Sequence, residues 1–317
     1  MPRGLLVVLA TVVLAALAAM AAGCAGAGAR TSPLTGTPAP AGAPVLAVKV
    51  DNSPAGRPWT GVEDADVVYV EPVEGGTTRL LAVFSSRLPP SVGPVRSARE
   101  SDVTVLGAYG RPGLAFSGSA PELAGTLAGA SLVPLTPQSA GAAFRRDGAR
   151  RAPVNLYADP AELLSAAGGG VSPPRDIGFR FGATPSGGEV VRHRDVTFGT
   201  AELGLTWDAV RGRWLVEPGG GDAAVPATGG EPIGAATVLV QRVTTRPSAI
   251  RDAAGAVSPY AVTTGEGEAE VLRDGRAYPA RWSRPTPADP TAVLGADRLP
   301  VAFAPGPVWV LLVPTDG

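Results

Sequence analysis

The sequence VEPVEGGTTR, at residues 70–79, decides how the first half of this chain folds. Residues 66–74 and 77–85 both have the apolar and β-branched character of strands, and Gly75 and Gly76 lie between them. Two glycines between such runs predict a β-hairpin with a two-residue turn, because the residues of that turn adopt positive φ. We therefore expect a sheet built around this hairpin.

A two-residue turn also fixes which side chains share a face of the hairpin. It pairs Glu74 with Thr77 and Pro72 with Arg79, and side chains alternate along each strand. Glu74 and Arg79 then form a diagonal ion pair, whereas Glu71 points to the opposite face. This separation argues against Glu71 and Glu74 as the paired carboxylates of a glycosidase, unless a bulge at Pro72 brings them together.

Glu71 is predicted to lie on an otherwise apolar face of the hairpin. A carboxyl group buried there needs a charged partner or a raised pKa. Arg96, Arg99 and Asp51 are the neighbours that we expect. Two interpretations stay open: a buried structural network, or a ligand or catalytic site with Asp51 or Glu71 as the acid or base.

A second charged motif, GPVRSAR, occupies residues 93–99. Arg96 and Arg99 lie three residues apart, so a helical turn from Ser97 would let both guanidinium groups converge on one carboxylate or phosphate. Arg57 would add a third donor; alternatively, these arginines bind backbone carbonyls. The candidate ligand-binding residues are Asp51, Asn52, Arg57, Glu71, Glu74, Arg79, Arg96 and Arg99.

Lys49 is the only lysine among 27 lysine and arginine residues. A GC-rich genome accounts for the preference for arginine, so the arginine content is weak evidence of function. Lys49 lies in an apolar run at residues 45–50 that indicates a buried strand, and we interpret it as structural rather than as a Schiff-base lysine.

The composition changes in the middle of the chain. Strand-like and helix-like runs intermix up to about residue 168, and the glycines and prolines of residues 168–174 mark a break. The second half is almost purely strand and turn, with Asp274-Gly275 as its strongest hairpin signal. The predicted segments are a signal peptide (1–23), a lipidated Cys24 with a flexible tether (24–43), an α+β domain (44–170), a connector (171–200) and a smaller mostly-β domain (201–317).

The first residues are typical of a bacterial lipoprotein signal. Arg3 precedes an apolar run at residues 5–20, and small residues lead directly to Cys24, the only cysteine. One departure is Ala21, because leucine is usual three residues before the lipidated cysteine. Ordinary secretion and an uncleaved anchor are the alternatives. Lipidation of Cys24 would place the protein at the outer face of the cytoplasmic membrane.

Composition excludes several kinds of partner and site. A net charge of −1 argues against binding of nucleic acid, which requires a basic surface. One cysteine and one histidine leave little for a transition-metal site or a cysteine nucleophile, and we expect no metal or other cofactor. His193 lies in a charged stretch and is expected at the surface. Most of the tryptophans are expected in the core.

The residues quoted above resemble the YerB-like lipoprotein family, whose function is unknown. The runs EGGTTR (74–79) and GPVRSAR (93–99) carry the resemblance most specifically, and TVLVQ (237–241), GEGEA (265–269) and PGPVW (305–309) extend it into the second half. The resemblance implies a two-part, strand-rich α+β protein, with a layered sandwich in its first domain and a lipid anchor. It supplies no catalytic residues.

Together these observations favour a non-enzymatic binding or assembly module, anchored to the membrane by lipid, whose acid and arginine cluster recognises an anionic or carbohydrate ligand. The partner would be a cell-wall polymer or an envelope protein. A hydrolase or transferase that uses Asp51 or Glu71 is one alternative. A purely structural interaction module is the other.

Overall fold

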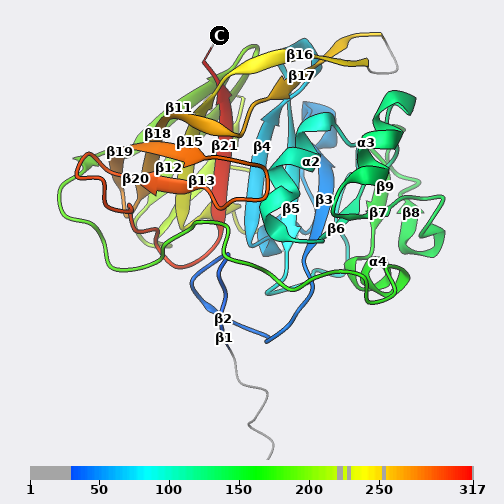
Figure 1. Cartoon of the computed structure of the whole chain (residues 1–317), viewed down its shortest axis with the longest axis horizontal. Coiled ribbons are helices and arrows are strands. Elements are labelled where there is room, and N and C mark those ends of the chain that lie inside the picture. Colours follow the sequence, from blue (N-terminus) through cyan, green and yellow to red (C-terminus); the bar gives the residue numbers. More distant parts are fainter. Residues whose placement is uncertain (1–29, 220–223, 227–229, 252–254, 316–317) are drawn as a thin grey trace, which may run out of the picture.

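The structure is a computed structural model that describes residues 30–219, 224–226, 230–251 and 255–315. The signal peptide and Cys24 lie outside the described residues. No helix in the described part of the chain is long and apolar enough to cross a membrane. One sheet of eleven strands runs through both halves of the described chain (Figure 1).

The central sheet joins the two halves through the last strand of the chain. β21 (Val308–Pro314) pairs in parallel with β4 (Val67–Pro72) on one side and with β15 (Thr237–Val243) on the other. The remaining strands follow outward from β4 as β5 (Thr78–Phe84), β3 (Leu46–Asp51), β6 (Gly113–Ala115) and β7 (Val133–Leu135), and outward from β15 as β18 (Gly265–Arg273), β19 (Arg276–Arg284), β10 (Glu189–Val190) and, also on β19, β20 (Ala292–Leu294).

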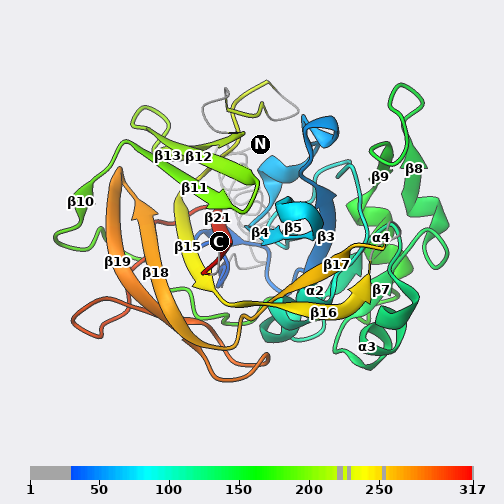
Figure 2. The same cartoon turned by 90° about the horizontal axis from the view of Figure 1, so that it is seen from above.

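Both faces of this sheet are covered, as Figure 2 shows from above. Along β21, Trp309, Leu311 and Val313 enter one hydrophobic core, and the alternate residues enter the other. Strands that are buried on both faces read as continuous apolar runs, which explains the sequence VWVLLV. Trp309 also packs against Trp59, with 6.0 Å between ring centroids, so an apolar contact links the two halves.

The two covering layers differ. Helices α2 (Glu100–Leu106) and α3 (Ala124–Gly129) cover one face of the first half, and a four-stranded sheet and α4 (Pro160–Ala166) pack on the other face. Asp159 accepts hydrogen bonds from the Ala161 and Glu162 amides and so caps the start of α4. The four-stranded sheet is β11 (His193–Phe198), β12 (Ala201–Asp208), β13 (Arg213–Pro218) and β14 (Gly234–Ala235).

Short 3-10 helices and two-stranded sheets complete the described fold. The 3-10 helices are η1 (Pro54–Gly56), η2 (Val62–Asp64), η3 (Glu74–Gly76), η4 (Gly107–Tyr109), η5 (Pro121–Leu123) and η6 (Gly141–Ala143). The small sheets are β1 (Arg30–Thr31) with β2 (Pro38–Ala39), β8 (Phe144–Arg146) with β9 (Leu156–Ala158), and β16 (Thr245–Arg251) with β17 (Val257–Ala261).

The β16–β17 hairpin is an arm that reaches from the second half over α2 in the first half (Figures 1 and 2). The Tyr260 hydroxyl lies 2.6 Å from that of Thr104, and the Ala261 amide donates to Ser101. The Arg246 guanidinium lies 4.0 Å from the centre of the Tyr260 ring. The contacts of Tyr260 and Ala261 hold the arm against α2, whereas the Arg246–Tyr260 contact lies within the arm.

The structure confirms the predicted α+β class and the mostly-β second half, and it corrects the hairpin at residues 70–79. Glu71 pairs with Arg79 and Pro72 with Thr78, so the loop is longer than two residues. The Thr200 amide donates to the Gly76 carbonyl and holds this longer loop. The register shift places Arg79 on the same face as Glu71.

The segment that the sequence assigns to a flexible tether is partly folded. β1 and β2 form a hairpin within it, and the side chain of Leu34 is fully buried. The Gly306 amide also donates to the Thr35 carbonyl. The buried Leu34 side chain and the hairpin hydrogen bonds contribute to the ordering of this segment.

Candidate functional site

A pocket of about 450 Å³ lies between the first half and the β16–β17 arm. It collects arginine, acidic, hydroxyl and small apolar side chains from segments far apart in the sequence. Its lining residues are Glu74, Arg79, Arg96, Ser97, Ala98, Arg99, Ser119, Ala120, Pro121, Glu122, Ile250, Arg251 and Ser258. Four of the predicted ligand residues, Glu74, Arg79, Arg96 and Arg99, therefore line one pocket.

Asp51 holds two of these arginines from behind the pocket wall. Its Oδ2 lies 2.9 Å from Nε of Arg96 and 3.8 Å from Nε of Arg79, and its Oδ1 accepts the Ser53 amide. Asp51 is only 1% exposed, whereas the side chains of Arg79 and Arg96 are 13% and 22% exposed. Both guanidinium groups thus share one buried carboxylate and remain accessible from the pocket.

Burial also acts on the charge of Arg79. Burial lowers the pKa of its guanidinium group; the Asp51 carboxylate opposes this shift, and the positive charges of Arg96 and Arg99 add to it. Nη1 of Arg79 donates to the Thr78 carbonyl at 3.0 Å, while the nearest carboxylate lies at the longer distance of 3.8 Å. An added anion would relieve this repulsion.

Arg99 is fully engaged by a different carboxylate. Its Nε and Nη2 donate to the two oxygens of Glu74 at 2.7 and 2.8 Å, which is a bidentate pair. Ser258, on the arm, also donates to Glu74. The predicted Glu74–Arg79 ion pair is therefore wrong, because the longer loop turns Glu74 toward Arg99 and the arm.

A sealed charge cluster lies beneath the pocket. Nζ of Lys49 donates to Glu71 and, at 2.6 Å, to Oδ1 of Asp102, and all three side chains are at most 1% exposed. Lys49 reaches Glu71 across the intervening strand β5. Oδ2 of Asp102 accepts the backbone amide of Arg99 at 2.6 Å. The cluster therefore connects β3, β4 and α2 with Arg99, the last residue of the GPVRSAR run (93–99).

One cation faces two carboxyl groups in this cluster, an arrangement that favours a proton on one of the carboxyl groups. Burial raises the pKa of Glu71 to about 8, against the opposing effect of Lys49 and with a further rise from Asp102. Burial would lower the pKa of Lys49, but Asp102 and Glu71 outweigh it and raise that pKa. Oε1 of Glu71 has no hydrogen-bond partner among the described residues, as a neutral carboxyl oxygen can tolerate better than a charged one.

Asn52 and Arg57, the remaining predicted ligand residues, bind other parts of the protein outside the pocket. Nδ2 of Asn52 donates to Thr78 at 2.7 Å, and Arg57 donates to the Asn52 carbonyl at 2.8 Å. Neither residue lines the pocket, so Arg57 is not a third donor beside Arg96 and Arg99. The predicted partners of Glu71 were also wrong, because Lys49 and Asp102 occupy that place.

His193 and most of the tryptophans agree with their predicted surroundings. His193 is exposed and contacts Thr206 and Asp195 through its ring nitrogens. Four of the five tryptophans are buried: Trp59, Trp214, Trp282 and Trp309. The described residues contain no group of histidine, cysteine and acidic side chains that could hold a metal ion.

Sequence reasoning missed Lys49, Asp102 and the arm as parts of this site. Lys49 had a usable signal: a lysine in the middle of a buried strand requires a carboxylate nearby. Its retention in a chain that otherwise uses only arginine is a second signal. The arm residues Ile250 and Ser258 lie about 160 residues from the arginines in sequence, and nothing local marks them as neighbours.

The Glu71→Gln substitution should change how stability depends on pH. Glu71 loses its proton near pH 4.5 in the unfolded chain but only near pH 8 in the folded protein. Between these two pH values, the folded state therefore binds one proton more than the unfolded state. The free energy of unfolding of the wild type should therefore fall across this range, by at most about 1.4 kcal/mol per pH unit from this group. Glutamine does not titrate and should abolish this part of the slope.

Urea unfolding of both chains at pH 5, 6.5 and 8 measures the difference. Burial also raises the pKa of Asp66, but that group is present in both chains and cancels in the comparison. Parallel pH profiles for the wild type and Glu71→Gln would show that Glu71 is ionised like an ordinary surface carboxylate.

Comparisons with known proteins identify the family. The model for "Protein of unknown function (DUF3048) N-terminal domain" matches residues 34–170, and the corresponding C-terminal domain model matches residues 194–310. A protein of Bacillus subtilis (strain 168), named "Putative lipoprotein YerB", is 48% identical over 64 residues, which span 20% of this chain and only 19% of that protein.

The crystal structure of YerB from Bacillus subtilis has the same fold. It superimposes with a TM-score of 0.75 at 22% identity, and the alignment covers 90% of this chain and 96% of that one. Because both domain models match and together cover most of the sequence, the chain belongs to the DUF3048 family of YerB-like proteins.

Proposed function

We propose that this protein is a lipid-anchored, extracytoplasmic binding protein that holds an anionic group of the cell envelope on Arg79 and Arg96. One observation carries the proposal: two accessible guanidinium groups share the single buried carboxylate of Asp51. Such a pair has unused donors and an excess of positive charge, and the planar guanidinium fork suits a carboxylate or phosphate oxygen pair.

The proposed location rests on the sequence around Cys24 and on the name of the Bacillus subtilis relative. Residues 25–29 alone separate Cys24 from the folded hairpin that begins at Arg30. Such a segment spans at most about 20 Å, so lipidation would hold the body near the headgroups.

The pocket would then face away from the membrane. The β16–β17 arm, which forms part of the pocket wall, lies at the opposite end of the molecule from β1 and β2 (Figure 1). This orientation suits recognition of a wall component rather than of a lipid headgroup.

The geometry supports binding more than catalysis by Asp51 or Glu71. A general acid or base must reach the reacting group of its substrate. Asp51 is occupied by two arginines and a backbone amide, and Glu71 is sealed under the pocket against Lys49. Neither carboxyl group lines the pocket.

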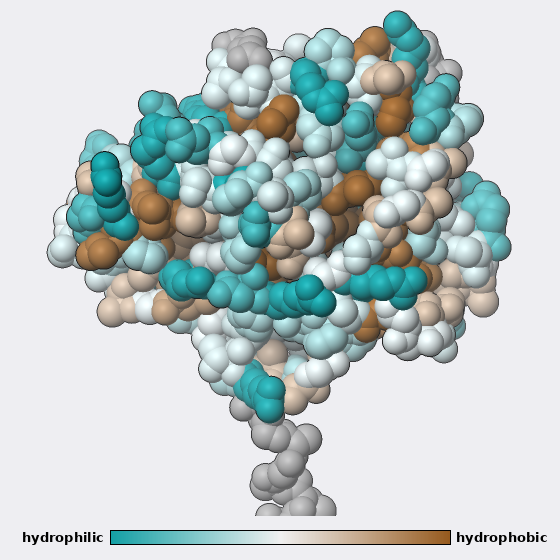
Figure 3. Space-filling model, in the orientation of Figure 1, coloured by the Kyte–Doolittle hydropathy of each residue, from teal (hydrophilic) through white to brown (hydrophobic). Residues whose placement is uncertain are grey.

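A purely structural interaction module would need a surface for its partner. The exposed large apolar side chains of the described residues are single and lie on separate elements, namely Leu88, Val190, Val210, Val257 and Leu299. The space-filling view likewise shows separate apolar patches among hydrophilic side chains on this face (Figure 3). The charged pocket is therefore the better candidate for recognition.

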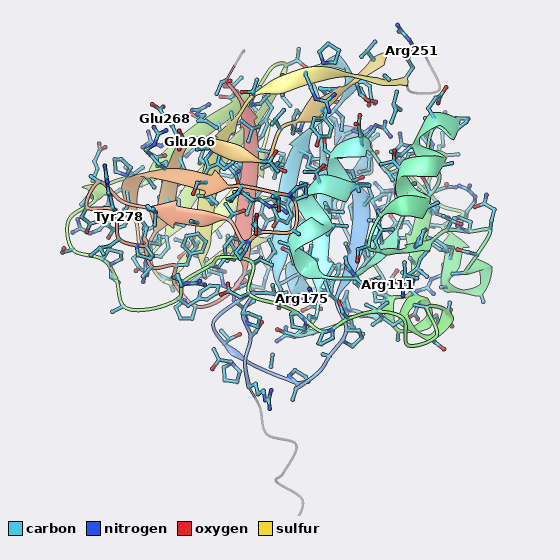
Figure 4. All side chains as sticks on the ribbon, viewed as in Figure 1. Arg111, Arg175, Arg251, Glu266, Glu268 and Tyr278 are labelled. Atoms are coloured by element: carbon cyan, nitrogen blue, oxygen red, sulfur yellow. The ribbon has the colours of Figure 1, made fainter. Side chains whose placement is uncertain are left out.

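The Arg79→Gln substitution should weaken binding to purified, insoluble cell walls. Loss of a charged hydrogen-bond donor commonly costs about 1.5–3 kcal/mol, which corresponds to roughly tenfold or more in affinity. Cosedimentation of the unlipidated Cys24→Ser chain with and without Arg79→Gln measures this loss. Arg175→Gln is the matched control, because Arg175 is exposed and lies away from the arm (Figure 4).

Two results would contradict binding of the cell wall at this pocket. In the first, Arg79→Gln cosediments as well as the wild type; in the second, Arg175→Gln loses as much binding as Arg79→Gln. Thermal unfolding of each variant shows whether the fold is intact before the binding results are compared.

The Cys24→Ser substitution should itself release the protein from the membrane. Serine cannot form the thioether to the diacylglyceryl group, so the chain should lose lipid labelling and leave the membrane fraction in a bacterial host. Continued incorporation of radiolabelled fatty acid into Cys24→Ser would refute lipidation at this residue.

A further inference from the structure

The charges of the pocket limit the ligand further, provided that the proposed function holds. Arg79, Arg96 and Arg99 carry three positive charges, and Asp51 and Glu74 supply two negative ones. Glu122 and Arg251, which also line the pocket, are both exposed and cancel each other. One added negative charge neutralises the pocket, so a monoanion fits better than a phosphate monoester with nearly two charges.

The pocket already holds a carboxylate in the geometry that a ligand would use. Both oxygens of Glu74 accept from Nε and Nη2 of Arg99. Arg96 uses Nε for Asp51 and Nη1 for the Pro153 carbonyl, at 2.9 and 3.3 Å. Its contacts and those of Arg79 still leave room for an acceptor on the side that faces the pocket.

The other lining residues indicate which chemical group of the ligand would lie next to its anionic group. Ala98, Ala120, Pro121 and Ile250 form a small apolar surface, and three serine hydroxyls lie among them: Ser97, Ser119 and Ser258. None of the lining residues that the structure describes is aromatic. The pocket therefore lacks the stacking surface with which aromatic side chains bind rings, and this argues against a sugar ring as the main contact.

We propose that the ligand is the carboxylate end of a short peptide with small aliphatic side chains. The terminal carboxylate would lie between Arg79 and Arg96, the peptide amides would meet the serine hydroxyls, and an alanine-sized side chain would pack against Ile250 and Ala120. A volume of about 450 Å³ holds such a segment but not a folded partner. A phosphodiester is also a monoanion, but the polyol on either side of it would leave the apolar surface unused.

Titration calorimetry of the Cys24→Ser chain tests this class with three probes of similar size. We expect N-acetylalanylalanine to bind, its C-terminal amide to bind at least tenfold more weakly, and glycerophosphoglycerol to bind more weakly than the free acid. Arg79→Gln should reduce binding of the acid by about tenfold, whereas Arg175→Gln should leave it unchanged.

Ile250→Ser gives a second readout that does not involve charge. It should lower the affinity for N-acetylalanylalanine several-fold. It should leave the affinity for acetate unchanged, because acetate lacks the aliphatic side chain.

The outcomes separate this inference from the proposed function. Equal affinity for the acid and the amide, or tighter binding of the phosphodiester, would overturn the peptide assignment. If cell-wall binding still depends on Arg79 in that case, the anion-binding function stands alone. If Arg79→Gln changes neither the binding of the small anions nor the binding to cell walls, both proposals fail.

Discussion

The buried contact of Lys49 with Glu71 and Asp102 is the interaction on which the rest of the site depends. It connects two strands of the central sheet with helix α2, and Asp102 uses its second oxygen to hold the backbone amide of Arg99. Removal of one partner from a buried ion pair commonly costs about 3–5 kcal/mol, because the remaining charge is left without compensation. The cluster thus fixes the position of the Arg99 backbone at the start of α2.

The pocket exists because the two halves of the chain share one sheet. β21, from the end of the sequence, pairs with β4, the hairpin strand that carries Glu71 opposite Arg79. The same arrangement brings the β16–β17 arm over α2, where Ser258 reaches Glu74 and Ile250 enters the pocket wall. Arg79, Arg96 and Arg99 come from the first half, and Ile250, Arg251 and Ser258 from the second. Neither half alone would form the pocket, although each matches its own family domain model.

Local patterns were sufficient to predict the class of the fold and most of the pocket charges. Alternating and continuous apolar runs predicted the strands, and Asp159 and the Asp274-Gly275 turn behaved as their chemistry requires: both turn residues have positive φ, 51° and 68°. The register of the hairpin at residues 70–79 was not predictable, because a tertiary contact from Thr200 stabilises the longer loop. That one-residue difference moved Arg79 to the face of Glu71, and it changed the partner of Glu74. The arm was missed for the related reason that its neighbours are distant in sequence.

Under the proposed function, Arg79 and Arg96 bind the anion through guanidinium N–H groups that Asp51 does not use, whereas Arg99 is already paired with Glu74. NMR spectra of the arginine Nη–H groups, recorded while acetate is added to the soluble chain, follow each guanidinium group separately. We expect saturable shifts of the Arg79 and Arg96 signals, a much smaller change at Arg99 because Glu74 occupies it, and none at Arg175. Shifts of equal size at all four arginines, or no change at Arg79 and Arg96, would show that the anion does not bind at this pair.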